Sequence, residues 1–343
     1  IELIKQNAET NQSESFPILD PIPSTVYNEN IMSISGKGSY HFTVLLYHND
    51  VLAGAQNCRD GVFRFSNIKL IPGDNHFSFK VFNLDNQFFE ISDHKVTYSS
   101  EEIDRFAENI SRGNNRRKEI SLTFDGGASD NSAILIMDIL REKEIQTTVF
   151  LTGQFIKNFP EAVKRILHDG HEIGNHTFSH PHLTTFEQNS RHELLSTITY
   201  DFFQSELIKA DSIFFNLTNS HMEKYWRAPF GEINRPLLLW AAELGYEHIS
   251  WTKGSIPGLN MDSYDWVSDE SSDLYRSGQE IMDRLIQFAD IDPYGANGAI
   301  ILMHLGTNRD KDFLFEILPE IIDEFQRRGY TFVTMSELLR KEN

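Results

Sequence analysis

Two histidines four residues apart, His176 and His180, give the clearest indication of chemistry in this sequence. They lie in the run HEIGNHTFSHPHL (residues 171–183), where a Gly-Asn pair ends a short strand and Pro181 stops any helix that follows. Two neutral imidazoles that converge at the end of a strand can bind one Zn²⁺, Ni²⁺ or Co²⁺ ion. An isolated pair of this kind is more often two surface histidines in a turn. Four further segments of the chain favour the metal site.

Two more reactive side chains, Asp125 and His304, lie where apolar runs end. Residues 120–124 and 299–304 have the length and composition of buried strands, and each run leads to one of these two side chains. In a fold of parallel strands the chemistry sits where strands end and loops begin. His176 also follows a short strand, so we expect the three side chains to share one site.

Strand and helix patterns alternate from Glu119 onwards. Strands are expected at 120–124, 147–151, 171–176, 246–251, 299–304 and 330–335, and helices at 131–143, 160–170, 236–245, 279–289 and 313–328. This alternation predicts an α/β domain over residues 119–343, with a parallel sheet closed into a barrel.

The first hundred residues have a different pattern. Residues 1–16 are polar and without periodicity, as in a flexible leader. Short alternating runs divided by turn residues then predict an all-β sandwich over residues 17–100, which resembles bacterial immunoglobulin-like modules. Residues 101–118 are expected to form a short helix and a polar linker. No cluster of acidic residues or histidines marks the sandwich as catalytic, so it is interpreted as a spacer or as a module that docks to the cell envelope.

Composition excludes several classes of partner. The formal charge of −19 over 343 residues disfavours nucleic acid, because phosphate contacts need a basic surface. No apolar run approaches the roughly 18 residues of a transmembrane span. Cys58 is the single cysteine, which rules out an internal disulfide and a cysteine metal cluster. The sequence starts at Ile1 rather than at Met, so we expect a removed signal peptide or anchor and a secreted or cell-envelope protein.

Five segments, in order, resemble the polysaccharide deacetylases, the carbohydrate esterase family 4 with a NodB-type domain. The resemblance covers roughly residues 119 to 340 and implies a distorted (β/α) barrel. The segments are TFDGG at 123–127, HTFSHP at 176–181, RAPFG at 227–231, DSYDW at 262–266 and LMH at 302–304.

The resemblance implies roles that agree with the chemistry of amide hydrolysis. Asp125 matches the general base, and Arg227 matches the arginine that keeps this carboxylate ionised and oriented. His304 matches the general acid for the departing nitrogen, and Asp265 matches the carboxylate that favours its imidazolium form. Asp262 competes with Asp265 for this last role.

The remaining family positions concern the substrate pocket and the metal. The backbone N–H of Phe230 matches the oxyanion donor, and Trp266 and Leu302 match the walls that receive the acetyl methyl group. His176 and His180 match ligands of one divalent ion. We expect Zn²⁺, with Co²⁺ or Ni²⁺ as alternatives.

One position departs from the family pattern. Gly126 stands where the family has a second aspartate that binds the metal. Two histidines alone hold a metal weakly, and catalytic zinc sites usually have three protein ligands. The third ligand is Asp125, Asp130, another loop or a water. We favour Asp125, on the expectation that the missing side chain leaves space beside it.

The sequence thus predicts a metal-dependent enzyme that removes N-acetyl groups from an N-acetylhexosamine polymer such as peptidoglycan or chitin. Two alternatives stay open. One is an O-deacetylase of an acetylated polysaccharide such as xylan. The other is a non-catalytic glycan-binding protein on a degenerate deacetylase scaffold. Gly126 supports this alternative, whereas the retained acid and base residues argue against it.

Overall fold

The computed structural model describes residues 16–341, except residues 59 and 86. The predicted leader, residues 1–16, lies outside this part of the chain but for Phe16. Contacts divide the chain into two compact units, and the division falls between Asp104 and Arg105. None of the helices in the described ranges combines the length and apolar composition that a membrane crossing needs.

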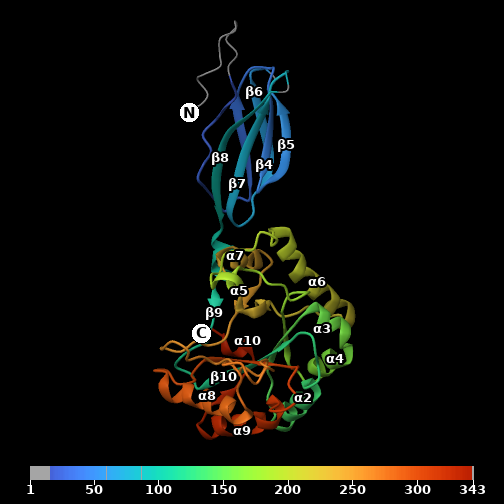
Figure 1. The fold of residues 1–343 in the computed structure, drawn as a ribbon, viewed down its shortest axis with the longest axis vertical. Helices are drawn as coiled ribbons and strands as arrows, with labels where there is room; N and C mark the ends of the chain where they lie inside the picture. The colour runs from blue at the N-terminus through green and yellow to red at the C-terminus, as the bar shows by residue number, and fades with distance from the viewer. Residues whose placement is uncertain (1–15, 59, 86, 342–343) are drawn as a thin grey trace. The chain divides into compact units, whose positions relative to one another are not determined.

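The first unit consists of two β-sheets (Figure 1). One sheet has the order β1-β3-β6 and the other the order β2-β8-β7-β4-β5. The strands are β1 (Ile18–Leu19), β2 (Thr25–Tyr27), β3 (Ile31–Lys37), β4 (Thr43–His48), β5 (Val51–Asn57), β6 (Val62–Lys69), β7 (Gly73–Phe82) and β8 (Phe88–Ser99). Alternate side chains of β3, β4, β6 and β7 are buried, as two sheets stacked face to face require. The resemblance of this unit to an immunoglobulin-like module stays a prediction.

The second unit contains a parallel sheet of eight strands, which confirms the α/β fold class. Its order is β15-β10-β11-β12-β13-β14-β9, and β16 pairs with β10 beside this path. The strands are β9 (Asn109–Ile110), β10 (Glu119–Gly126), β11 (Thr148–Leu151), β12 (Glu172–Asn175), β13 (Tyr225–Trp226), β14 (Glu247–Ile249), β15 (Ala299–His304) and β16 (Thr331–Phe332).

The barrel is distorted because its ends, β15 and β9, are not paired strand to strand. Irregular backbone spans this gap instead. Isolated bridges join Arg112 to Ala299 and Asp262 to Leu302, and the Thr252 N–H donates to the carbonyl oxygen of Ile300. The segment that carries Asp262 is therefore fixed directly against β15.

Helices cover the outside of this sheet (Figure 1). They are α2 (Ala133–Glu142), α3 (Gly153–Asn158), α4 (Pro160–His168), α5 (Phe186–Asn189), α6 (Tyr200–Thr218), α7 (Arg235–Glu243), α8 (Gly278–Ile291), α9 (Leu314–Arg327) and α10 (Met335–Leu338). The division between the two units falls within one further helix, α1 (Glu101–Phe106). Strand β10 is buried on both faces, as expected for a central parallel strand between layers of helices. Its alternating residues pack into one large apolar core with α2, α8 and α9.

The structure differs from the predicted linker at residues 101–118. Strand β9 lies within this segment and pairs in parallel with β14. Arg112 then forms an ion pair with Asp292, at 3.0 Å, and the Gly113 N–H donates to the Gly298 carbonyl. Residues 105–118 belong to the second unit, and their backbone supplies one edge of the sheet. A two-residue strand in a polar context leaves too short an apolar pattern for sequence analysis to detect.

Candidate active site

The predicted site residues lie together where the parallel strands end. Asp125 is the seventh residue of β10, and in the ladder it is the partner of His304, the last residue of β15. Asn175, which ends β12, is the partner of Trp226 in β13, so His176 and Arg227 leave the sheet side by side. Strand pairing thus brings four segments that are far apart in sequence to one place.

Asp125 forms a buried ion pair with Arg227. The guanidinium Nη1 donates to the Asp125 Oδ1 at 2.7 Å, and Nε donates to the Ile249 carbonyl at 3.0 Å. Arg227 is fully buried and its guanidinium lies over the Phe150 ring, at 4.2 Å from the centroid. Burial alone would raise the pKa of Asp125, but Arg227, followed by His176 and His304, outweighs it and holds this pKa below its ordinary value. Asp125 is therefore a carboxylate that can accept a proton.

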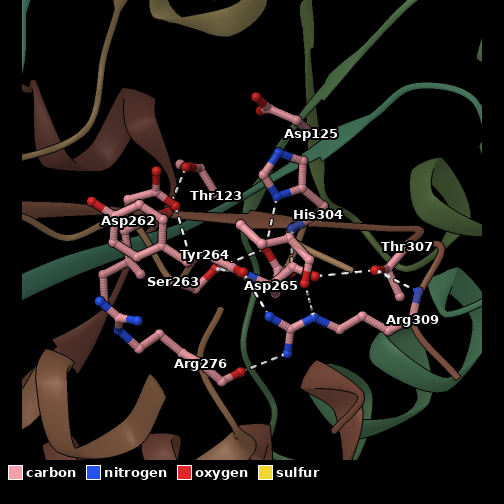
Figure 2. A network of polar contacts seen from close by, with 12 residues as sticks. Thr123, Asp125, Asp262, Ser263, Tyr264, Asp265, Arg276, His304, Thr307 and Arg309 are labelled. Atoms are coloured by element: carbon pink, nitrogen blue, oxygen red, sulfur yellow. Dashed lines mark hydrogen bonds and ion pairs between the residues drawn. The ribbon is translucent and has the colours of Figure 1, made fainter. Parts of the chain in front are cut away.

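His304 has the opposite protonation state. Its Nδ1 donates to the Asp265 Oδ1 at 2.7 Å, and its backbone N–H donates to Oδ2 at 2.9 Å (Figure 2). Burial by itself would lower the pKa of His304, but Asp265, followed by Asp125 and Asp262, raises it to about 9. The imidazolium is held with its Nδ1 on Asp265, which leaves Nε2–H as the proton that can be given away.

His176 and Asp125 have the separation expected of two ligands of one metal ion. The His176 Nδ1 donates to the Arg227 carbonyl at 2.9 Å, so its Nε2 carries the lone pair. That Nε2 lies 3.5 Å from the Asp125 Oδ2. Two ligand atoms bound at about 2.1 Å to a tetrahedral Zn²⁺ lie roughly 3.4 Å apart.

His180 is the third expected metal ligand, and it lies farther from the other two. Its ring centroid lies 4.8 Å from that of His176. Burial lowers the pKa of His180 to about 3, so both imidazoles are neutral, as metal ligands must be. No group of three or more acidic, His or Cys side chains in the described ranges has the geometry of a ready-made metal cage. The donor types fit a divalent ion, and two of the three are already at ligand spacing.

The space beside Asp125 is not free, which corrects the expectation drawn from Gly126. A Cβ at this position would lie 2.5 Å from the Leu151 Cδ2, 3.2 Å from the Phe155 Cδ2 and 3.3 Å from the Leu305 Cδ1. Apolar side chains therefore fill the place of a second aspartate. Asp125 is the carboxylate nearest to the histidines, and no contact joins Asp130 to either of them within the described ranges.

The residues expected to bind the substrate differ in exposure. Phe230 and Trp266 are about half exposed, as residues at the rim of a glycan site would be, whereas Leu302 is 4% exposed. Phe230 lies in the 3₁₀ turn Pro229–Gly231 with a φ of 56°, in the left-handed region that non-glycine residues seldom adopt. Its ring stacks on His182, with centroids 3.9 Å apart.

A buried carboxylate that sequence analysis missed holds the Phe230 turn to the histidine loop. Glu232 is 1% exposed and accepts hydrogen bonds from the N–H groups of Leu183 and Thr184, both at 2.7 Å. It also bonds to the His182 Nδ1 at 2.8 Å. An acidic residue in a polar loop is normally exposed, so this contact could not be predicted from the sequence. Asp262, the competing partner for His304, instead accepts from the Tyr264 N–H at 2.8 Å, and burial raises its pKa to about 6.

Comparison with known proteins agrees with this arrangement. The family model described as polysaccharide deacetylase matches residues 112–249. The peptidoglycan-N-acetylmuramic acid deacetylase PdaA of Bacillus subtilis is 30% identical over 228 residues, which are 66% of this chain and 73% of that protein. This chain belongs to the polysaccharide deacetylase family. Members of the family are generally metal-dependent, in agreement with the donor set of His176, His180 and Asp125.

Other polysaccharide deacetylases are similarly related. A peptidoglycan-N-acetylglucosamine deacetylase of Bacillus cereus is 31% identical over 229 residues, 66% of this chain and 90% of that protein. Among solved structures, the Bc1960 peptidoglycan N-acetylglucosamine deacetylase is similar with a TM-score of 0.56 and 26% identity, over 70% of this chain and 96% of that one.

Proposed function

We propose that this polysaccharide deacetylase hydrolyses the N-acetyl groups of an N-acetylhexosamine polymer, either peptidoglycan or a chitin-like glycan, and releases acetate. One observation carries the proposal: an ionised Asp125 and a protonated His304 are partners on neighbouring strands. A base and an acid held in opposite protonation states are what amide hydrolysis needs, because water must lose a proton and the leaving nitrogen must gain one.

Each side chain has a defined part in that reaction. Asp125 takes a proton from the water as the water oxygen bonds to the carbonyl carbon. The N–H of Phe230 donates to the developing oxyanion. His304 gives its Nε2 proton to the nitrogen as the C–N bond breaks, and Asp265 holds the other side of the imidazole throughout. A zinc ion held by His176, His180 and Asp125 would supply Lewis acidity to the carbonyl.

The state of His304 favours an amide over an ester as substrate. An amine leaves only after its nitrogen is protonated, and a pKa of about 9 keeps the imidazolium populated at neutral pH. The pair of His304 and Asp265 also argues against a glycan-binding protein without activity. Sugar binding requires neither a buried imidazolium nor a carboxylate that maintains it.

The names of the relatives support the substrate class. Those proteins are named as deacetylases of peptidoglycan N-acetylmuramic acid and N-acetylglucosamine, and a further relative from Bradyrhizobium, 26% identical, as a chitooligosaccharide deacetylase. We place the protein outside the cytoplasm or in the cell envelope, where a glycan polymer would be met, and assign to the first unit a docking role there.

Acetate release from a panel of glycans tests the proposal. The panel contains peptidoglycan, chitooligosaccharides and acetylated xylan, each incubated with chelated protein and with protein given Zn²⁺, Co²⁺ or Ni²⁺. We expect acetate from an N-acetylated glycan, dependent on metal. Asp125→Asn and His304→Ala should each lower kcat by about 10² to 10⁴ while the protein still folds.

Two results would overturn the assignment. Acetate from xylan alone would establish the esterase alternative. No acetate from any glycan, with metal shown to be bound, would establish a protein without this activity. Asp138→Asn is a suitable control, because this exposed carboxylate pairs with Arg141 and Arg165 on α2 and α4, outside the site.

A further inference from the structure

A short turn places Asp265 beside His304. In the turn of residues 264–267, the Val267 N–H donates to the Tyr264 carbonyl at 3.2 Å, and the turn presents both Asp265 and Trp266. Tyr264 has a φ of 57°, a left-handed conformation that costs a bulky residue free energy and persists only where the surroundings impose it. The turn lies in the long connection between β14 and α8, with no regular strand or helix to hold it.

A buried guanidinium supplies the missing support. Arg309 is 5% exposed, and its Nε donates to the Val267 carbonyl at 2.8 Å while Nη2 donates to the Tyr264 carbonyl at 2.7 Å. Figure 2 shows Asp265 between His304 and Arg309. One planar group therefore fixes the first and last carbonyls of the turn, a geometry that suits the rigid fork of arginine.

We call the bonds from Arg309 to the turn, together with those from Thr307, the clamp. Further bonds connect the clamp to neighbouring segments and to Asp265 itself. Nη1 donates to the carbonyls of Arg276, at 2.8 Å, and Asp312, at 3.1 Å. Thr307 Oγ1 donates to the Asp265 carbonyl at 3.1 Å and accepts from the Arg309 N–H at 3.2 Å (Figure 2). Among the described residues Arg309 has no carboxylate partner within ion-pair distance. The polar contacts of its guanidinium are with carbonyl oxygens, and this group lies over the Tyr275 ring, 4.5 Å from the centroid.

We propose that Arg309, assisted by Thr307, is a positioning residue for the general acid. Both follow His304 closely on the chain that leaves β15, so one segment carries the imidazole and also holds the turn that carries its carboxylate partner. Asp265 is thereby fixed from two sides, through its own contacts with His304 and through the backbone on either side of it. This inference rests on the proposed function, because it assigns a part in the same proton transfer.

The clamp should affect the catalytic rate more than substrate binding. Without Arg309 the turn loses its anchors at the Tyr264 and Val267 carbonyls, and Asp265 no longer keeps its two bonds to His304. A displacement of about 1 Å in a catalytic group can cost on the order of 10²-fold in rate. We expect kcat of Arg309→Ala to fall by about this factor. Its KM should change less than its kcat, because, of the expected pocket residues Phe230, Trp266 and Leu302, only Trp266 lies on the turn.

The experiment compares Arg309→Ala, Arg309→Lys and Thr307→Val with the wild type, at temperatures well below the melting point of each. Guanidinium ion at millimolar concentration should restore activity to Arg309→Ala. Lysine should not substitute, because an ammonium cannot reproduce the planar fork that bonds the four carbonyls of Tyr264, Val267, Arg276 and Asp312. Thr307→Val, which removes a single anchor, should lose less. Arg112→Ala is the matched control. Its guanidinium also bonds two carbonyls, of Gly295 and Asn297, but before β15 begins.

Hydrogen exchange gives a second measurement that does not depend on activity. Peptides containing His304 and residues 262–276 should lose protection in Arg309→Ala and retain it in Arg112→Ala. Unchanged protection of these peptides, or a kcat equal to that of the wild type, would overturn the inference. If Arg309→Ala does not fold, Thr307→Val decides by the same two criteria. If the wild type itself releases no acetate, the proposed function fails, and the exchange measurement still decides whether the clamp exists.

Discussion

Replacing Asp265 by Asn separates the charge of this side chain from its shape. Asp265 is 2% exposed, and its two oxygens accept from the Nδ1 and the backbone N–H of His304. The pKa of His304 lies at about 9 instead of the ordinary 6.5. At 1.36 kcal/mol for each pKa unit, this difference corresponds to roughly 3 kcal/mol in favour of the imidazolium. Without the charge of Asp265, burial opposes only the smaller effects of Asp125 and Asp262, so the pKa should fall towards its ordinary 6.5.

The sign of the pH effect follows from the role of His304 as an acid. Activity is present below its pKa and lost above it, so Asp265→Asn should move the alkaline limb of the kcat/KM profile from about 9 towards about 6.5. At pH 8 the protonated fraction would fall from about 0.9 to about 0.03, a loss of roughly 30-fold. The same linkage applies to stability. A pKa raised by folding stabilises the protein fully below pH 6.5, and this contribution is lost as the pH rises through about 9.

The assay is acetate release between pH 5 and 10, with Asp262→Asn as the matched comparison. Asp262 also raises the pKa of His304, but its contribution is smaller than that of Asp265. Its replacement should therefore move the limb by less. A limb that stays near 9 in Asp265→Asn would refute the reasoning. A larger shift in Asp262→Asn than in Asp265→Asn would show that the partner of His304 was assigned to the wrong carboxylate.

Three further predictions concern the metal and the fold. Gly126→Asp should lower the melting temperature of the metal-free protein, since overpacking typically costs about 1–3 kcal/mol. Gly127→Asp is the control, because it adds the same charge where no atom lies within 4 Å of the new Cβ. Equal melting temperatures for the two variants would show that the side chain at position 126 does not clash. The double variant His176→Ala, His180→Ala should contain well below one metal ion per chain by elemental analysis. A metal content equal to that of the wild type would show that the ion binds elsewhere. Removing residues 1–104 should leave the melting of the second unit unchanged, whereas removing residues 1–118 should lower it, because β9 is lost; equal melts would show that β9 contributes nothing.

The sequence predicted the parts of the site that strand ends determine. Asp125, His176 and His304 follow apolar runs, and parallel pairing brings such positions together whatever the loops do. The order of eight strands in the second unit was beyond sequence analysis, because several are only two or three residues long and carry no measurable periodicity. Strand β9 was missed for this reason.

Contacts made through buried loops could not be predicted either. Glu232 and Arg309 are charged residues in polar surroundings, and composition assigns such residues to the surface. Their burial results from backbone N–H and carbonyl groups that converge on them only in the folded chain. Gly126 shows that the space around a missing side chain could not be predicted either. The absence of a side chain was evident from the sequence, but whether water or leucine occupied the space depended on Leu151 and Leu305 from two other segments.

The position of β10 in the sheet has a consequence for the order in which the protein folds during synthesis. β10 carries Asp125 and lies between β11, about 25 residues later, and β15, about 180 residues later. Contacts of such long sequence separation form late, and a chain emerging from the ribosome completes its amino-terminal units first. The first unit can therefore reach its final state while β10 still exposes one edge to solvent. Until β15 arrives, that edge is open to pairing with other chains, so the catalytic domain is the part expected to require a chaperone.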